Sequence, residues 1–302
     1  MGLNLSGMTT ETRNPRTMQL DQMSPLEIVT VMNEEDARVP LAIAKCLPQI
    51  AQAVTWAAEA FEKGGRLFYM GAGTSGRLGV LDAAECPPTF GVPKEMVVGL
   101  IAGGEKAFIE AVEGAEDSRE LAVEDLKAHG LTANDLVVGI AASGRTPYVL
   151  GGLDYAKSVG CHTAAIACNI GSAIGKAAEL AIEVNCGPEV LTGSTRLKSG
   201  TAQKLILNMI STGSMVRTGK AYQNLMVDVQ QTNEKLHTRA ENIVIDATGV
   251  EREKARAAID AAGGSVKTAI TMLLKDCDAK EAARRLERAR GHVREAIRLE
   301  VL

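Results

Sequence analysis

The chain has 302 residues, of which 46% are hydrophobic and 23% are charged, and its formal net charge is −4. This length accommodates one large domain and a smaller appendage, and the mild acidity argues against nucleic-acid binding, which needs a clustered basic surface. The amino end shows no basic flank before an apolar core, and no run of about 18 apolar residues occurs. We therefore expect a soluble protein that is not exported and has no membrane partner.

The cysteines and histidines give no sign of a metal site. The six cysteines contain no CxxC pair, and because most lie in apolar segments we expect buried thiols in a reducing compartment. The four histidines are scattered without the spacing of metal ligands. We therefore expect neither a metal nor a cofactor.

The first 62 residues predict a helical segment, to which we assign no catalytic or binding role. Residues 1–15 suggest a mobile leader, and Ser24-Pro25-Leu26-Glu27 is a helix start with proline at the first helical position. The Ala-rich sequence that follows predicts two or three helices, broken at Pro40 and Pro48. We expect them to pack on the main domain.

A strand, a glycine-rich turn and a helix start come next, and together they predict an anion site. Arg66–Met70 is a short apolar run bounded by glycines, which is typical of a buried strand. The loop Gly71–Gly76 follows, and a helical pattern runs from Arg77 to Ala84. Glycines let backbone N–H groups approach a ligand, and the helix dipole favours negative charge. Thr74 and Ser75 add hydroxyl donors, so we expect both to bind a phosphate.

This helix leads to Glu85, and we expect it to stop at Cys86-Pro87-Pro88 because proline cannot continue the hydrogen-bond ladder. A carboxylate about one helix length from a phosphate cradle favours acid–base chemistry on a small phosphorylated substrate. A single glutamate at a helix end is, however, more often solvated than catalytic. The spacing alone leaves both interpretations of Glu85 open.

The same glycines fit a weaker alternative, which is dinucleotide binding. Gly71, Gly73 and Gly76 match that fingerprint, but alone it is a weak signal. A dinucleotide site needs an acidic residue at the end of the next strand, whereas the next apolar run, Met96–Ala102, ends in Gly103-Gly104. This mismatch argues against a dinucleotide.

Four further apolar runs continue an alternation of strands and helices. They are Met96–Ala102, Asp135–Ala141, Cys161–Cys168 and Ala181–Cys186. Helices are expected at 105–112, after an N-cap at Ser118, after Pro147, at 173–180 and from 202 to about 217. This rhythm predicts an α/β fold with a doubly wound, parallel five-stranded sheet flanked by helices. Ligands of such sheets bind at the carboxyl ends of the strands.

Two more loops rich in Ser, Thr and Gly follow strands of this sheet. The loop after the third strand offers Ser143 and Thr146, and the loop after the fifth offers Ser194 and Lys198 at the start of a long helix. We expect these side chains to bind the same anion. Ordinary N-capping by Ser194 or Thr195 would explain one hydroxyl, but not three such loops in one sheet.

Residues 246–302 shift in composition towards Ala, Arg, Lys and Glu. We expect three short helices there, at Glu251–Ala262, Ser265–Leu274 and Ala279–Leu299. Their spacing resembles a small helical module of the ubiquitin-associated type, to which we assign a supporting or oligomer-contact role.

Five stretches of the chain resemble a known family. They are Thr10–Asn14, Gly71–Gly79, Asp82–Phe90, Glu113–Asp117 and Gly187–Lys204. Together they look like the N-acetylmuramic acid 6-phosphate etherases, and the last stretch is specific to that family and its relative, the glucokinase regulatory protein. The resemblance implies a sugar isomerase (SIS) fold for residues 63–245, a cytoplasmic homodimer and no required metal.

The resemblance also implies an activity. It is cleavage of the lactyl ether of N-acetylmuramic acid 6-phosphate by elimination and water addition, which gives N-acetylglucosamine 6-phosphate and D-lactate during recycling of cell-wall amino sugars. By the same resemblance the catalytic pair falls on Glu85 and Glu116. We expect Glu116 to take the C2 proton, and Glu85 to protonate the lactate oxygen and later activate water. For His237 a structural role is favoured over one in the site or at a partner subunit.

Two other functions would use the same phosphate-binding loops. A regulatory protein that binds a sugar phosphate without chemistry would not need two acids, and it would be expected to carry two sheet domains instead of one. Aldose–ketose isomerisation of a sugar phosphate would use the same fold and a similar enolisation. The Gly187–Lys204 stretch and the motif around Glu85 argue against the isomerase.

Overall fold

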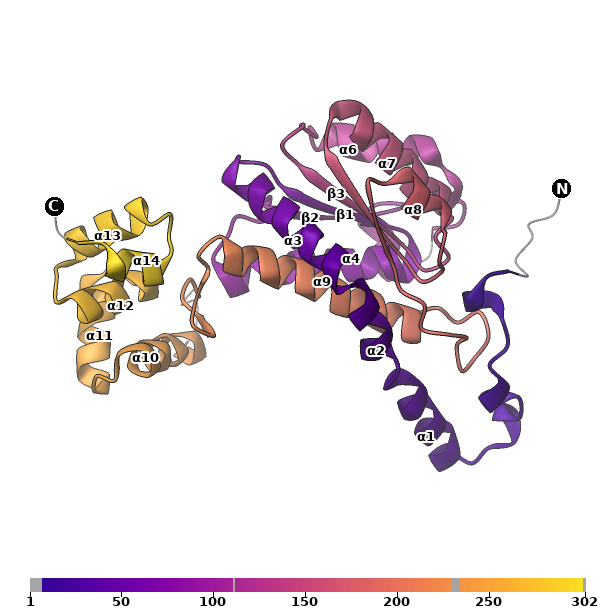
Figure 1. Cartoon of the computed structure of the whole chain (residues 1–302), viewed down its shortest axis with the longest axis horizontal. Coiled ribbons are helices and arrows are strands. Elements are labelled where there is room, and N and C mark those ends of the chain that lie inside the picture. Colours follow the sequence, from indigo (N-terminus) through magenta and orange to yellow (C-terminus); the bar gives the residue numbers. More distant parts are fainter. Residues whose placement is uncertain (1–6, 111, 230–233, 301–302) are drawn as a thin grey trace. The chain divides into compact units, whose positions relative to one another are not determined.

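A computed structural model describes residues 7–110, 112–229 and 234–300 (Figure 1). The chain divides into two compact units, one formed by the residues up to 84 with 95–211, and the other by 85–94 with the residues from 212 onward. The domain boundaries expected after residues 62 and 245 stay predictions.

The amino-terminal segment is built from short helices. These are the 3₁₀ helices η1 (Thr9–Glu11), η2 (Pro15–Thr17), η3 (Leu20–Gln22) and η4 (Ala44–Cys46), and the α-helices α1 (Pro25–Asp36), α2 (Val39–Ile43) and α3 (Leu47–Glu62). Ser24 and Glu27 form a capping box at the start of α1, as the sequence predicts.

The expectation of a mobile leader is wrong for residues 9–15. Thr10 is 2% exposed and Asn14 is 4% exposed, and both side chains have hydrogen-bond partners far along the chain, Asn169 and Glu35 respectively. Residues 1–6 of the expected leader lie outside the described residues.

The predicted parallel sheet is confirmed. Its strands are β1 (Leu67–Gly71), β2 (Val97–Ile101), β3 (Leu136–Ala141), β4 (His162–Ala167) and β5 (Leu180–Glu183), in the order β2-β1-β3-β4-β5 with every pair parallel. Gly71 pairs with Ile101 and Ile140, and Ala141 pairs with Ala167. The carboxyl ends of four strands are therefore level, and the loops that follow them open at one edge.

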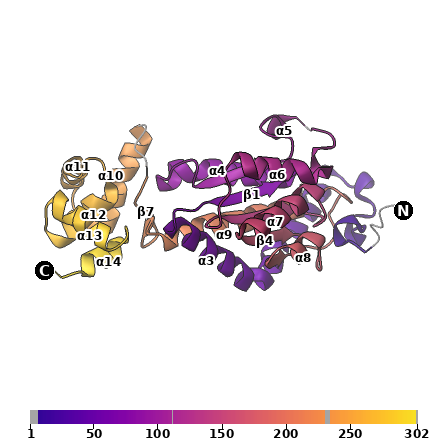
Figure 2. The ribbon, with the colours of Figure 1, turned by 90° about the horizontal axis from the view of Figure 1, so that it is seen from above.

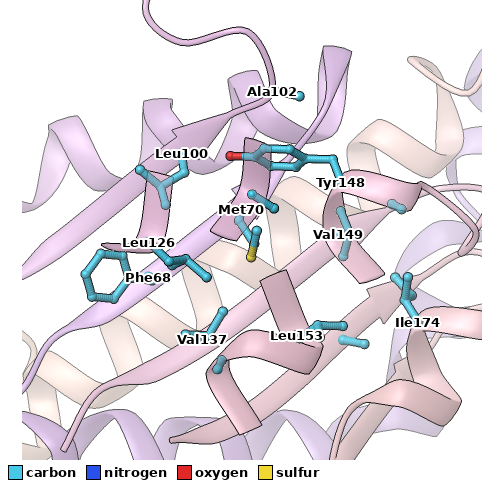
Figure 3. Packing of buried hydrophobic residues seen from close by; sticks show 14 of the residues in the cluster. Phe68, Met70, Leu100, Ala102, Leu126, Val137, Tyr148, Val149, Leu153 and Ile174 are labelled. Carbon is cyan, nitrogen blue, oxygen red and sulfur yellow. The ribbon is translucent and has the colours of Figure 1, made fainter. Parts of the chain in front are cut away.

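Helices cover both faces of the sheet. On one face lie α6 (Arg119–Ala128), α7 (Pro147–Val159) and α8 (Ala173–Ala177), with α6 and α7 side by side (Figure 2). Figure 3 shows Met70 of β1 among apolar side chains of α6 and α7. A Cβ on Gly152 of α7 would lie 2.0 Å from Met70 Cε, so this glycine makes room for the methionine. The other face is covered by α3 and by the first parts of α4 (Gly73–Phe90) and α9 (Lys198–Arg217).

Helix α4 approaches the sheet closely because two glycines lack side chains there. A Cβ on Gly79 would lie 2.9 Å from Tyr69 Cβ in β1. In β2, a Cβ on Gly99 would lie 2.5 Å from Cα and 2.7 Å from the backbone nitrogen of Val80 in α4. Real Cβ atoms do not approach backbone this closely, so Gly99 fixes the distance between α4 and β2.

Helix α4 also runs further than predicted, because Pro87 and Pro88 lie inside it and do not end it. The helix ends at Phe90, and Gly91 takes the left-handed conformation with φ +61°. The N–H of Gly91 donates to the carbonyl of Pro87 at 2.9 Å, which is the usual chemistry of a glycine after a helix. Helix α5 (Lys106–Ile109) is shorter than the helix predicted at 105–112.

The second unit contains a short hairpin and a helical module. The elements are β6 (Ala221–Tyr222), β7 (Leu225–Met226), α10 (Glu234–Thr248), α11 (Arg252–Ala261), α12 (Val266–Lys275), α13 (Ala279–Arg288) and α14 (Val293–Arg298). The single helix predicted at 279–299 is wrong, because Arg290 (φ 50°) and Gly291 (φ 81°) turn the chain between α13 and α14.

The six cysteines carry thiols and form no disulfides, and five of them are buried, as the sequence predicts. Burial raises the pKa of the Cys161 thiol to about 12, so this thiol is not a nucleophile at neutral pH. In the part of the chain that the structure describes, no helix is long and apolar enough to cross a membrane.

We predict that Gly99→Ala lowers the free energy of unfolding by about 2 kcal/mol, because the new methyl group forces α4 away from β2. Urea denaturation followed by circular dichroism measures this change. Gly7→Ala is the matched control, since a Cβ on Gly7 would have nothing within 4 Å. Equal stability of the two variants would show that α4 does not depend on this close approach.

Candidate functional site

The loop after β1 forms the floor of the site. Strand β1 ends at Gly71 and α4 begins at Gly73, so the first N–H groups of α4, which have no partners within the helix, open at the carboxyl edge of the sheet. A Cβ on Gly76 would lie 2.6 Å from the carbonyl oxygen of Gly71, which explains the glycine at this tight turn.

A cavity of about 220 Å³ lies beside this loop. It is lined by Ala72, Gly73, Arg77 and Glu116, among others. The Arg77 guanidinium donates to the carbonyl of Phe108 at 2.8 Å, so the cavity wall carries a fixed positive charge. The sequence interpretation did not include Arg77, although it directly follows the glycine loop.

Glu116 reaches this cavity from a separate turn. It lies in the 3₁₀ helix η5 (Ala115–Asp117) and is exposed. Gly114 precedes the turn with φ +76°, and Ser118 then caps α6 by accepting from the N–H of Leu121 at 3.1 Å. The N-cap predicted at Ser118 is confirmed, and it fixes the turn that carries the carboxylate.

Glu85 lies on α4 within the second compact unit. Its side chain is exposed, whereas its neighbour Cys86 is 2% exposed. His237 is also in this unit, exposed on α10. The catalytic role expected for Glu85 and the structural role expected for His237 stay predictions.

Ser75 is held by a residue that sequence analysis missed. The Ser75 hydroxyl is buried and donates to Gln203 Oε1 at 3.0 Å. Gln203 is 1% exposed, and its Nε2 has no hydrogen-bond partner among the described residues. Thr74 Cγ2 lies 3.6 Å from the position of a Cβ on Gly200, so the glycine loop adjoins the start of α9. The one signal for Gln203 in the sequence is its place in the Gly187–Lys204 motif.

The loop after β3 places Ser143 and Thr146 at the same edge of the sheet, both half-buried. It is a tight turn in which the N–H of Gly144 donates to the carbonyl of Ala141 at 3.0 Å. Thr146 is the N-cap residue of α7 but makes no capping hydrogen bond, and Pro147 opens the helix as predicted.

The start of α9 is capped by a carboxylate, not by Ser194 or Thr195. Glu189 is 1% exposed and accepts from the backbone N–H groups of Lys198 at 3.0 Å and Ser199 at 2.9 Å. These two N–H groups are therefore occupied by the chain itself. Ser194 is half-buried in the preceding turn.

Lys198 is buried in an ion pair. Its Nζ lies 2.6 Å from Glu35 Oε2, and each of the two side chains is 1% exposed. Burial alone would raise the pKa of the Glu35 carboxyl, but hydrogen bonds from Lys198, Arg16 and Asn14 outweigh that effect and lower the pKa to about 2. The contact with a substrate that was expected of Lys198 stays a prediction.

Comparison with family models supports a SIS fold. Residues 49–157 match the glucokinase regulatory protein N-terminal SIS domain, and residues 120–212 match the SIS domain. A phosphoheptose isomerase structure from Francisella tularensis aligns with a TM-score of 0.50 at 18% identity, over 64% of this chain and 100% of that chain. This last likeness shows the fold alone.

Two curated relatives extend over almost the whole chain. A protein of Exiguobacterium sp. (strain ATCC BAA-1283 / AT1b) is 62% identical over 97% of this chain and 100% of its own length. One of Serratia proteamaculans (strain 568) is 61% identical over 98% of this chain and 99% of its own length. Both are named N-acetylmuramic acid 6-phosphate etherase.

We predict that Glu35→Gln lowers the free energy of unfolding at pH 7 by about 3 kcal/mol, because the Lys198 ammonium stays buried without its counter-ion. The pKa of Glu35 falls from an ordinary value of 4.5 to about 2 on folding. Its stabilisation is therefore full above pH 4.5 and disappears as the pH falls through about 2.

The measurement is urea unfolding of both proteins across that pH range at constant ionic strength. The difference between wild type and variant should shrink from pH 4.5 towards 2. Glu34→Gln is the control, because the Glu34 side chain is 51% exposed and its pair with Arg16 lies at the surface. A Glu35→Gln variant as stable as Glu34→Gln at pH 7 would contradict the prediction.

Proposed function

This chain belongs to the N-acetylmuramic acid 6-phosphate etherase family, and we propose how it cleaves the D-lactyl ether of that sugar phosphate. The products are N-acetylglucosamine 6-phosphate and D-lactate. The observation that carries the activity is identity of about 60% to etherases over nearly the full length of both chains.

The chemistry has to overcome a poor leaving group. The C2 proton of the ring-opened sugar lies alpha to the aldehyde, so a carboxylate can remove it while a carboxylic acid protonates the departing lactate oxygen at C3. The elimination leaves an unsaturated aldehyde, and water then adds at C3. One well-placed general acid or base contributes roughly 10²–10⁴-fold to the rate.

We assign the C2 base to Glu116 and the acid to Glu85, which afterwards activates the water. The place of Glu116 on the wall of a cavity shared with the glycine loop supports this assignment. A catalytic carboxylate has to lie within hydrogen-bond reach of the substrate once the phosphate is anchored. Glu85 is exposed to solvent.

The phosphate is anchored by the hydroxyls of the loops after β1 and β3. These are Thr74, Ser75, Ser143 and Thr146, with Ser194 and Lys198 as further candidates. The shared edge of the sheet and the free helix start at Gly73 support this set. Because the phosphate is remote from the bond that breaks, its binding energy serves to hold the sugar in a reactive pose.

We further propose a cytoplasmic homodimer that acts in recycling of cell-wall amino sugars. The dimer is supported by exposed apolar side chains on the amino-terminal helices, where Leu26 is 74% exposed and Leu41 is 70% exposed. The reaction itself needs neither a metal nor a redox cofactor, because proton transfers between carboxyl groups and substrate account for every step.

A sugar-phosphate-binding regulatory protein is the second candidate, favoured by the match of residues 49–157 to the regulatory-protein model. Such a protein would bind the sugar phosphate and release no lactate. Lactate release by the purified wild-type chain therefore separates the two functions.

The division of labour is tested in deuterium oxide. Glu85→Gln should lower lactate release about 10²–10⁴-fold yet still exchange deuterium into C2, whereas Glu116→Gln should lose both. Asp117→Asn, an exposed acid in the same turn as Glu116, is the control and should keep both activities. Loss of exchange in Glu85→Gln would reverse the two roles.

A further inference from the structure

The amino-terminal motif Thr10–Asn14 has no part in the mechanism above, yet its first and last side chains, those of Thr10 and Asn14, are buried against the site loops. The backbone N–H of Thr10 donates to Asn169 Oδ1 at 3.4 Å, and Asn169 Nδ2 donates to Thr10 Oγ1 at 3.1 Å. Thr10 is 2% exposed and Asn169 is 7% exposed. Two residues far apart in the sequence thus donate hydrogen bonds to each other, and both are shielded from water.

Asn169 connects this pair to the loop that carries Ser143. Its Nδ2 also lies 3.3 Å from the carbonyl oxygens of Ala142 and of Ser143. The two hydrogens of this amide nitrogen are shared by three acceptors, namely the Thr10 hydroxyl and the two carbonyls. The Thr10 hydroxyl therefore helps to fix the directions of the two N–H bonds. The N–H of Cys168 donates to the same Ala142 carbonyl at 3.0 Å. The peptide groups on either side of Ser143 are therefore oriented from β4 and from the amino-terminal segment.

The other end of the segment is tied to the loop between β5 and α9. Asn14 Nδ2 donates to the carbonyl of Pro188 at 3.1 Å and to Glu35 Oε2 at 3.0 Å, the oxygen that also pairs with Lys198. Glu11 Oε2 lies 3.8 Å from the position of a Cβ on Gly193. Figure 1 shows this segment, in indigo, beside the loop that precedes α9.

Packing alone does not account for these contacts. An apolar side chain at position 10 or 14 would cover the carboxyl edge of the sheet equally well. Buried polar atoms, in contrast, have to keep all their hydrogen-bond partners in one geometry. The segment joins the loops after β3 and β5, which both offer hydroxyls to the phosphate in the proposed function.

We propose that Thr10 and Asn169 are positioning residues for the substrate-binding loop that carries Ser143. They touch no substrate themselves, and they act by fixing the peptide groups around Ser143. This inference rests on the proposed function, because it assumes that the Ser143 loop holds the phosphate.

The test is Thr10→Val, which keeps the shape of the side chain and removes its hydroxyl. We expect the KM for N-acetylmuramic acid 6-phosphate to rise about three- to tenfold, the range that one lost hydrogen bond gives, with kcat within about twofold. Thr10→Ser should restore the wild-type KM. Thr12→Val is the matched control, because Thr12 is exposed and its hydroxyl donates to the carbonyl of Thr9 within the same turn.

Substitution of Asn169 tests whether the two residues act through the same interaction. The double variant Thr10→Val/Asn169→Ser should raise KM no more than Asn169→Ser alone, because both changes break the same interaction. Additive effects, or a KM of Thr10→Val equal to that of Thr12→Val, would overturn the inference.

Binding of inorganic phosphate, measured by calorimetry on the same proteins, separates failure of this inference from failure of the proposed function. A wild type that releases no lactate refutes the proposed function. The positioning role is then decided by phosphate affinity, which should be three- to tenfold weaker in Thr10→Val than in Thr12→Val. Equal phosphate affinity in the two variants would overturn it.

Discussion

The site depends on the parallel pairing of the sheet strands. Since Gly71 is level with Ile101 and Ile140, and Ala141 with Ala167, four chain segments end at the same edge. The positions proposed for the phosphate and for Glu116 depend on that alignment, because the loops that carry the polar groups begin at this edge of the sheet. Glycines are needed at the turn after β1 and also where α4 packs closely on β1 and β2.

A second constraint is the buried polar network around the start of α9. Glu189 caps the helix, and Glu35 holds the Lys198 ammonium at 2.6 Å. Buried ion pairs are poor sources of net stability, since desolvation offsets most of their attraction. Their effect here is geometric, because they set where α9 begins and hence where Gln203 meets Ser75.

Local patterns in the sequence predicted most of the fold. Apolar runs, glycine loops and caps predicted all five strands, their parallel direction and the loops that hold Thr74, Ser75 and Ser143. What failed was set by tertiary context. The prolines at 87 and 88 were expected to end a helix, yet α4 passes through them and ends at Phe90, just before Gly91.

The missed parts of the site have a common physical cause, which is pairing between distant residues. The contact between Lys198 and Glu35 spans 163 positions, and that between Thr10 and Asn169 spans 159. No periodicity or spacing reports such a partner, so the sequence analysis assigned Lys198 no counter-ion and described residues 9–15 as a mobile leader. Gln203 was missed for the same reason, since its partner Ser75 lies 128 positions away.

The central claim is that the ether breaks by elimination and that water then adds to the sugar. The most direct measurement is mass spectrometry of both products after the wild-type chain has turned over N-acetylmuramic acid 6-phosphate in ¹⁸O-water. The account predicts ¹⁸O at C3 of N-acetylglucosamine 6-phosphate, with the original ether oxygen leaving in lactate. A label in the lactate hydroxyl and none at C3 would instead mean that water displaces the sugar at the lactyl carbon, and it would contradict the account.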